Sequence, residues 1–253
     1  MEKNLYRAAK GQARSPVFRV VVVFCLFAIG CCLSGCLIPA GQHPRCLSSR
    51  QEVELAASNL EDIDIRNLPL EDYPRLTKFV RLKRLQLYSI NGDSATDEKL
   101  EALAGIGFTN LVDINLLNGR LITDRGIRAL ATIASLQELQ LEGTSITDDA
   151  LRMLCAKPGF RGVNVANCRG VSLTGLKIIC QCEHFDEVSF SADGLSQFDV
   201  RGLLEQMAGS VKWCGIVDRD LRLDETALQV LASKKDFRLV ISAKGALQYM
   251  QEL

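Results

Sequence analysis

The sequence predicts an α/β solenoid, with a curved parallel sheet on its concave side and helices on its convex side. An apolar pattern L-x-x-L-x-L returns at intervals of 24 to 29 residues through most of the chain, within the range known for stacked strand–helix repeats. A second apolar pattern with helical spacing follows most copies. At 253 residues and 47% hydrophobic content, the chain is long enough to bury one sizeable core.

The first half of each repeat is predicted to be a strand whose apolar residues face the core, because side chains alternate along a strand. The copies are Leu60/Ile63/Ile65, Leu82/Leu85/Leu87, Leu111/Ile114/Leu116, Leu136/Leu139/Leu141, Phe160/Val163/Val165, Phe185/Val188/Phe190, Val211/Cys214/Ile216 and Phe237/Val240. Because the copies keep one phase, their strands are expected to stack in register.

The second half of each repeat is predicted to be a helix. Three copies begin with a Thr-Asp pair, at residues 96–97, 123–124 and 147–148, where a side-chain oxygen can cap free backbone N–H groups. Apolar residues with helical spacing follow, ending on a small residue: Leu100/Leu103/Ala104, Ile127/Leu130/Ala131, Leu151/Leu154/Cys155 and Leu176/Ile179/Cys180. At the end of the chain, residues 237–241 are predicted as a strand, and Leu247, Met250 and Leu253 as one face of a closing helix.

One copy, LQLEGTSITDDAL at residues 139–151, resembles the cysteine-containing class of leucine-rich repeats, found in F-box-type adaptors and in many bacterial proteins. The resemblance covers residues 53–253 and is best from Leu82 to Cys180. It implies a leucine-rich-repeat solenoid that binds a partner. The sequence departs from the pattern in a longer loop at residues 91–95 and in degenerate fifth and sixth repeats.

The first 35 residues are interpreted as a signal peptide. Five basic residues and one acidic residue precede Cys36, and an uncharged apolar run follows the basic stretch from Val20 to Leu33. This run is short for a transmembrane helix and ends on Leu33-Ser34-Gly35-Cys36. That end resembles the bacterial lipobox, whose cysteine receives lipid. Cys36 is therefore the predicted lipidation site, fatty acids such as palmitate would hold the protein at a membrane, and residues 36–52 are expected to be a tether.

Two other interpretations of the leader stay open. An apolar stretch extended through Ala40 would be an uncleaved signal anchor, and the Arg-containing start also suits a mitochondrial presequence. In both bacterial interpretations the positive charge precedes the apolar segment, so the body is expected outside the cytoplasm, in the cell envelope.

Composition and motifs exclude several function classes. Lys plus Arg equals Asp plus Glu at 30 each, which gives no basic excess for nucleic acid. Four cysteines fit packing positions of the repeat, namely Cys155, Cys168, Cys180 and Cys214, whereas Cys46 and Cys182 have no assignment and a disulfide between them stays open. His43 and His184 are the two histidines, and no catalytic or metal-binding constellation surrounds either. No enzyme activity, metal or cofactor is expected.

Binding is expected on the concave sheet face. The residues assigned to it are Arg84, Gln86, Tyr88, Asn115, Leu117, Gln140, Glu142, Asn164 and Trp213, with Asp113, Glu138, Arg161, Ala166 and Ser189 completing the strip. Tyr88 is singled out because amphipathic aromatics are frequent in binding hot spots. A protein or peptide is the favoured ligand, because solenoids offer extended concave surfaces. Cell-wall glycan is second, since the strip lacks a ladder of aromatics. The sequence indicates no oligomeric state.

Two functions therefore compete. The first is a lipid-anchored, extracytoplasmic module that binds protein. The second is an intracellular-type adaptor, either related to F-box proteins or exported to another cell. An F-box-like module should precede the repeats, and residues 51–81 are too short for one and already contain a repeat copy.

Overall fold

The computed structural model describes residues 44–87, 95–217, 238–243 and 246–252. Contacts group residues 44–253 as one compact unit, and this unit is described here. The leader, with Cys36 and His43, lies outside the described residues, as does Tyr88. Within the described part, no helix is both long and apolar enough to cross a membrane.

Strands and helices alternate along the unit, as the repeat predicts. In chain order they are β1 (Arg45–Leu47), α3 (Arg50–Leu55), β2 (Asp62–Ile65), the 3-10 helix η1 (Leu70–Lys78), β3 (Arg84–Gln86), α4 (Asp97–Gly105), β4 (Asp113–Asn115), α5 (Asp124–Leu130), β5 (Glu138–Gln140), α6 (Asp148–Cys155), β6 (Gly162–Asn164), α7 (Leu173–Gln181), β7 (Glu187–Ser191), α8 (Gln197–Gln206), β8 (Trp213–Val217), β9 (Arg238–Ala243) and β10 (Ala246–Glu252).

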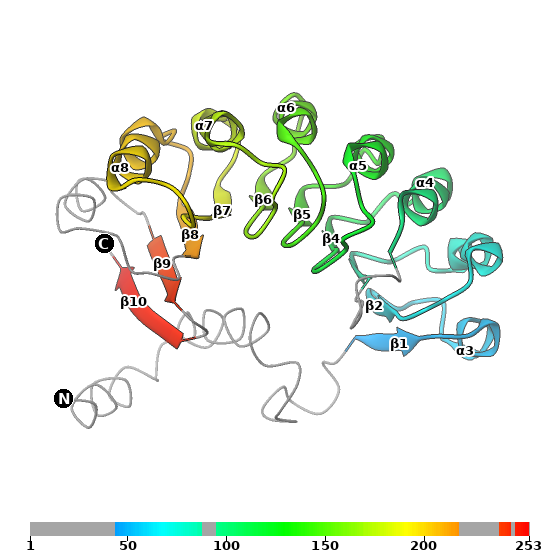
Figure 1. Cartoon of the computed structure of the whole chain (residues 1–253). Coiled ribbons are helices and arrows are strands. Elements are labelled where there is room, and N and C mark those ends of the chain that lie inside the picture. Colours follow the sequence, from blue (N-terminus) through cyan, green and yellow to red (C-terminus); the bar gives the residue numbers. More distant parts are fainter. Residues whose placement is uncertain (1–43, 88–94, 218–237, 244–245, 253) are drawn as a thin grey trace, which may run out of the picture. The chain divides into compact units, whose positions relative to one another are not determined.

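The strands form one open sheet in sequential order from β1 to β10. All pairs from β1/β2 to β8/β9 are parallel. Within this unit the strands line the inner side of an arc and the helices its outer side (Figure 1). The leucine-rich-repeat solenoid predicted from the sequence is confirmed.

The core lies between sheet and helices, where the repeated apolar residues stack in columns. The middle apolar residue of each strand is the register partner of the next: Ile63, Leu85, Ile114, Leu139, Val163, Val188 and Cys214 follow one another across the sheet. All seven are buried, and Phe160 and Phe185 fill larger spaces with their ring centroids 5.6 Å apart. Because the apolar pattern keeps the same phase from repeat to repeat, its residues form one continuous core.

The helices begin at the predicted residues. Thr96, Thr123 and Thr147 are the N-caps of α4, α5 and α6, and each side chain accepts a hydrogen bond from a backbone N–H of its helix. In the degenerate fifth repeat, Ser196 and Asp199 form a reciprocal capping box at the start of α8.

Two segment predictions are corrected by the structure. Residues 44–52 are not a tether: β1 pairs in parallel with β2, and α3 begins at Arg50 with Ser49 as its N-cap. The solenoid therefore begins before residue 53. Buried Leu47 and Val53 extend the core. The turn-forming prolines just upstream led to the prediction of a tether here.

The predicted closing helix is also wrong. Residues 238–243 do form a strand, but β10 then pairs antiparallel with β9 from Ala246 to Glu252. A seven-residue segment gains little from isolated helix formation. As a strand it pairs with the backbone groups at the open edge of β9.

The cysteines show one departure from the prediction. Cys168, Cys180 and Cys214 are buried, as their repeat positions indicate. Cys155, which was assigned only a packing role, forms a disulfide with Cys182, with their Cα atoms 6.0 Å apart. Cys46 is exposed as a free thiol, so the alternative of a Cys46–Cys182 bond is wrong. The strand–helix phase could not reveal this bond, because Cys182 lies beyond the last turn of α7.

Candidate concave binding face

The candidate site is the sheet face that the helices do not cover. Because side chains alternate along a strand, the first and third residues of each strand from β2 to β9 lie on this face. They form two rows of register partners across the sheet, and we call the first residues the outer row and the third residues the inner row. The outer row is Asp62, Arg84, Asp113, Glu138, Gly162, Glu187, Trp213 and Arg238. The inner row is Asp64, Gln86, Asn115, Gln140, Asn164, Ser189, Gly215 and Val240.

Most residues assigned to this face from the sequence lie there, but some serve the fold itself. Asn115 Oδ1 accepts a hydrogen bond from the backbone nitrogen of Leu117 at 3.0 Å, and Asn164 Oδ1 does the same for Ala166. These amides hold the turns that follow their strands. Gln86 and Gln140 are half-buried in the inner row.

Glu142 lies two residues beyond Gln140, after the end of β5, and its Oε1 accepts a hydrogen bond from Asn167 Nδ2 at 2.9 Å. Burial raises the pKa of Glu142, while hydrogen bonds from Asn167 and Asn164 act in the opposite direction.

Arg161 is a correction to the predicted strip. The residue opposite Glu138 and Glu187 is Gly162, so the predicted position was one residue too early. Counting back from the buried Val163 by strand alternation would have found it. Arg161 precedes β6 and pairs with Asp186, with Nη1 and Oδ2 3.6 Å apart.

Carboxylates dominate the middle of the outer row. Arg84 pairs with Asp62 at 2.9 Å, whereas Asp113, Glu138 and Glu187 form no ion pair among the described residues. Asp113 Oδ1 is moreover buried without a hydrogen-bond partner there. The row therefore holds three carboxyl groups that form no ion pair in the described part of the chain, although Arg84 and Arg161 act on Asp113 and Glu138 through their charge.

Burial, and then repulsion by neighbouring carboxylates, raises the pKa of each of these groups. Burial raises the pKa of Asp113 to about 7, with repulsion by Glu138 adding to it and Arg84 opposing it. The pKa of Glu187 also rises to about 7. Solvent reaches this side chain from the open side, but the surrounding sheet removes much of its hydration, and Glu138 and Asp186 repel it. The pKa of Glu138 is raised by burial and then by Asp186. Glu187 was not assigned to this face from the sequence, although it precedes Val188 as Glu138 precedes Leu139 and strand alternation would have found it.

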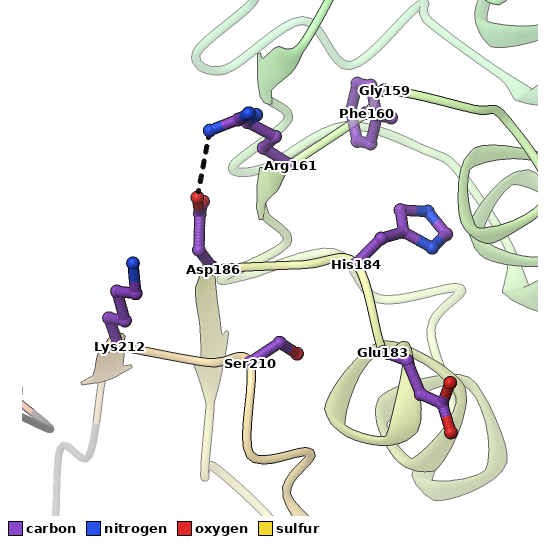
Figure 2. A pocket seen from close by; sticks show the side chains of 8 residues that line it. All are labelled: Gly159, Phe160, Arg161, Glu183, His184, Asp186, Ser210 and Lys212. Carbon is purple, nitrogen blue, oxygen red and sulfur yellow. Dashed lines mark ion pairs between the residues drawn. The ribbon is translucent and has the colours of Figure 1, made fainter. Parts of the chain in front are cut away.

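A shallow pocket of about 430 Å³ adjoins the start of β6, β7 and β8. Its lining is Gly159, Phe160, Arg161, Glu183, His184, Asp186, Ser210 and Lys212. Figure 2 shows Arg161 and Lys212 on either side of Asp186, while the side chains of His184 and Glu183 point in other directions. The polar groups do not converge on one point. The sheet face is therefore the better candidate.

Metal and nucleophile chemistry find little support in the described residues. No group of three or more His, Cys, Asp or Glu side chains there is arranged to hold a metal ion. His184 lies with Nε2 3.6 Å from the sulfur of Cys182, which is already bonded to Cys155.

Comparisons with known proteins identify the fold. No family model matches the sequence, and no curated protein matches it. Among solved structures, the leucine-rich-repeat protein LegL7 from Legionella pneumophila matches with a TM-score of 0.53 and 17% identity, over 79% of this chain and 75% of that one.

Two further matches are more distant. An internalin (inlF) from Listeria monocytogenes has a TM-score of 0.37 and 15% identity over 76% of this chain and 56% of that one. The tropomodulin C-terminal domain of Caenorhabditis elegans has a TM-score of 0.39 and 16% identity over 65% and 90%. The likeness to LegL7, together with the register of the strands, shows that this chain has the leucine-rich-repeat fold.

Proposed function

We propose that the chain is an extracytoplasmic lipoprotein, anchored through Cys36, whose solenoid binds a protein or peptide on its concave face. The observation that carries the binding role is the outer row, where Asp113, Glu138 and Glu187 face the concavity without an ion-pair partner in the described residues. Carboxylates that lie close together without an ion pair repel one another in the free protein. A partner with positive charge would relieve this repulsion, which favours its binding.

The Cys155–Cys182 disulfide supports the extracytoplasmic location. Such bonds persist in oxidising compartments and are rare in the cytosol. The basic-then-apolar leader ending at Leu33-Ser34-Gly35-Cys36 supports the lipid anchor. Acyl chains on Cys36 would hold the body at the membrane surface of the bacterial envelope.

The anchor is tested by metabolic labelling with a clickable fatty acid. Label is expected on the wild-type chain and not on Cys36→Ser, with Cys46→Ser as the matched control that keeps it. Full labelling of Cys36→Ser would reject the anchor. Alkylation of free thiols before and after reduction, in whole cells, reports the disulfide independently.

The binding role is tested by photo-crosslinking on the full chain in membranes. A photoreactive residue replaces Gln140 on the concave face or, as control, Asp149 on the convex helix α6. A discrete adduct is expected from position 140 alone. Equal adducts from both positions, or none from 140, would reject a concave binding face.

A further inference from the structure

The outer row contains one position without a side chain, Gly162, flanked by Glu138 on β5 and Glu187 on β7. A Cβ atom built on Gly162 would lie 3.3 Å from Glu138 Cγ and 3.3 Å from Glu187 Cβ. The stems of the two glutamates therefore close in over the glycine from both sides. We call these three residues the acidic notch.

An aromatic ring continues the row beside the notch. Trp213 on β8 is the register partner of Glu187, and it is half-buried. Its ring lies along Gly215, two residues further on the same face, because a Cβ there would be 2.8 Å from Trp213 Cη2. Gly215 thus provides the space in which the indole lies against the sheet, on the strand next to Glu187.

Neighbouring cations form no ion pair with Glu138 or Glu187 in the described part of the chain, although the charge of Arg161 opposes the rise in the pKa of Glu138. Arg161, one residue before Gly162, pairs with Asp186 at 3.6 Å (Figure 2), and Arg84 pairs with Asp62 at 2.9 Å. Arg238, the partner of Trp213 on β9, bounds the row on the far side. The acidic segment therefore has a basic residue at each end and carboxylates between them.

We propose that the acidic notch and Trp213 form a subsite for a lysine or arginine side chain carried by an extended segment of a partner protein. The cation lies over Gly162 between the carboxylates of Glu138 and Glu187, as a charge-assisted hydrogen-bond donor to both. Its aliphatic stem packs on the indole, because the stems of Lys and Arg cover apolar surface while the charged end stays with polar groups. The inference rests on the proposed function, since it names the partner chemistry of that same face.

Three features together select this occupant. Two carboxylates favour positive charge, the missing side chain at Gly162 lets the stems of Glu138 and Glu187 approach each other, and the indole on the neighbouring strand favours a cation with an apolar stem. In the free protein, burial and then repulsion by Glu138 and Asp186 raise the pKa of Glu187. A partner cation would restore the ionised form.

Trp213 is the only tryptophan of the chain, so its fluorescence reports the subsite directly. The full chain in detergent is titrated with an eight-residue peptide of alternating glycine and lysine, and with the same peptide carrying glutamine for lysine. A saturable change is expected with the lysine peptide alone, weakening as salt rises. Equal responses to both peptides, or no response to either, would overturn the proposal.

Variants locate the effect in the notch. Glu138→Gln combined with Glu187→Gln is expected to weaken binding of the lysine peptide by about tenfold or more. Asp149→Asn, on the convex helix α6, is the matched control and is expected to leave it unchanged. Gly162→Ala adds a methyl group that presses the two glutamate stems apart and should weaken binding of the lysine peptide, with circular dichroism checking that the variant is folded. Unchanged affinity in the double glutamine variant would refute the subsite.

The same titrations separate other occupants and the proposed function. A response to calcium or to spermidine as strong as that to the lysine peptide would overturn recognition of a side chain, in favour of a simple cation site. A crosslinked partner at position 140 without lysine-peptide binding would leave the proposed function standing and reject this subsite. Lysine-peptide binding without any adduct at position 140 would leave the subsite standing and reject the proposed function, because no partner protein would then occupy the face in membranes.

Discussion

The carboxylate of Asp97 on α4 accepts hydrogen bonds from both the backbone nitrogen and the hydroxyl of Thr123 in the next repeat, at 2.9 and 2.6 Å. It also accepts one from the backbone nitrogen of Gly126 at 3.0 Å. Asp124 holds Thr147 in the same way, and Asp148 holds Ser172. Each aspartate therefore joins the start of its own helix to the start of the next one.

Removing the first of these links should destabilise the solenoid. Asp97 is buried, and Asp97→Ala leaves the backbone nitrogens of Thr123 and Gly126 without their acceptor. We expect the free energy of unfolding to fall by about 1–3 kcal/mol, measured by urea denaturation. Asp149→Ala, at an exposed position of α6, is the control. Equal losses in the two variants would contradict the role of Asp97 between repeats.

The register of the sheet predicts opposite results for two adjacent residues. Leu139 is fully buried in the apolar column, whereas Gln140 faces the concavity. Leu139→Asp places a charge in the core and is expected to unfold the domain. Gln140→Asp should keep the wild-type circular dichroism spectrum and a Tm within a few degrees. Comparable damage from both would show that the register is wrong.

The disulfide should contribute to stability by restricting the unfolded chain. Cys155 and Cys182 are 27 residues apart, and closing a loop of that length is worth about 3–4 kcal/mol in the chain-entropy model. A reducing agent is therefore expected to lower the Tm of the wild type. The double variant Cys155→Ala/Cys182→Ala should have the lower Tm already and respond no further to reduction. A wild-type Tm insensitive to complete reduction would argue against this contribution.

The crowded carboxyls give stability a predictable dependence on pH. Asp113 faces Glu138, Asp62 and Glu187 as well as Arg84, and its pKa is raised to about 7 in the folded chain. A raised pKa means that its contribution to stability is fully present below its unfolded value, about 4, and is lost as pH rises through about 7.

Asp113→Asn should therefore flatten the pH profile. The wild type is expected to lose stability between about pH 4 and pH 7 from this group, and the variant to lose less, in thermal melts across that range. Asp149→Asn serves as the exposed control, with the wild-type profile. A steeper loss in Asp113→Asn than in the wild type would show that the sign is wrong.

The last two strands should protect the end of the sheet. β9 pairs with β8, and β10 covers the outer edge of β9, so truncation after Asp236 exposes the edge of β8. We expect a lower Tm and concentration-dependent association, because open edges pair with other chains. Light scattering and thermal melts measure both. A monomeric truncated chain with the wild-type Tm would make these strands dispensable.

The sequence by itself determined the repeat and its phase. A buried column such as Leu85, Ile114 and Leu139 recurs at nearly constant spacing, so periodicity alone assigns the inward and outward side of each strand. The helix starts at Thr96, Thr123 and Thr147 follow equally from local chemistry, because a cap acts within one turn of its own helix.

Only the tertiary structure decided the features that join one repeat to another. The Asp97–Thr123 link, the Cys155–Cys182 bond and the approach of Glu138 to Glu187 over Gly162 each connect residues about 25 positions apart or more. Sequence spacing does not show which side chains meet across that distance. The final segment, β10, was decided in the same way, because the open edge of β9 outweighed a weak local preference for helix.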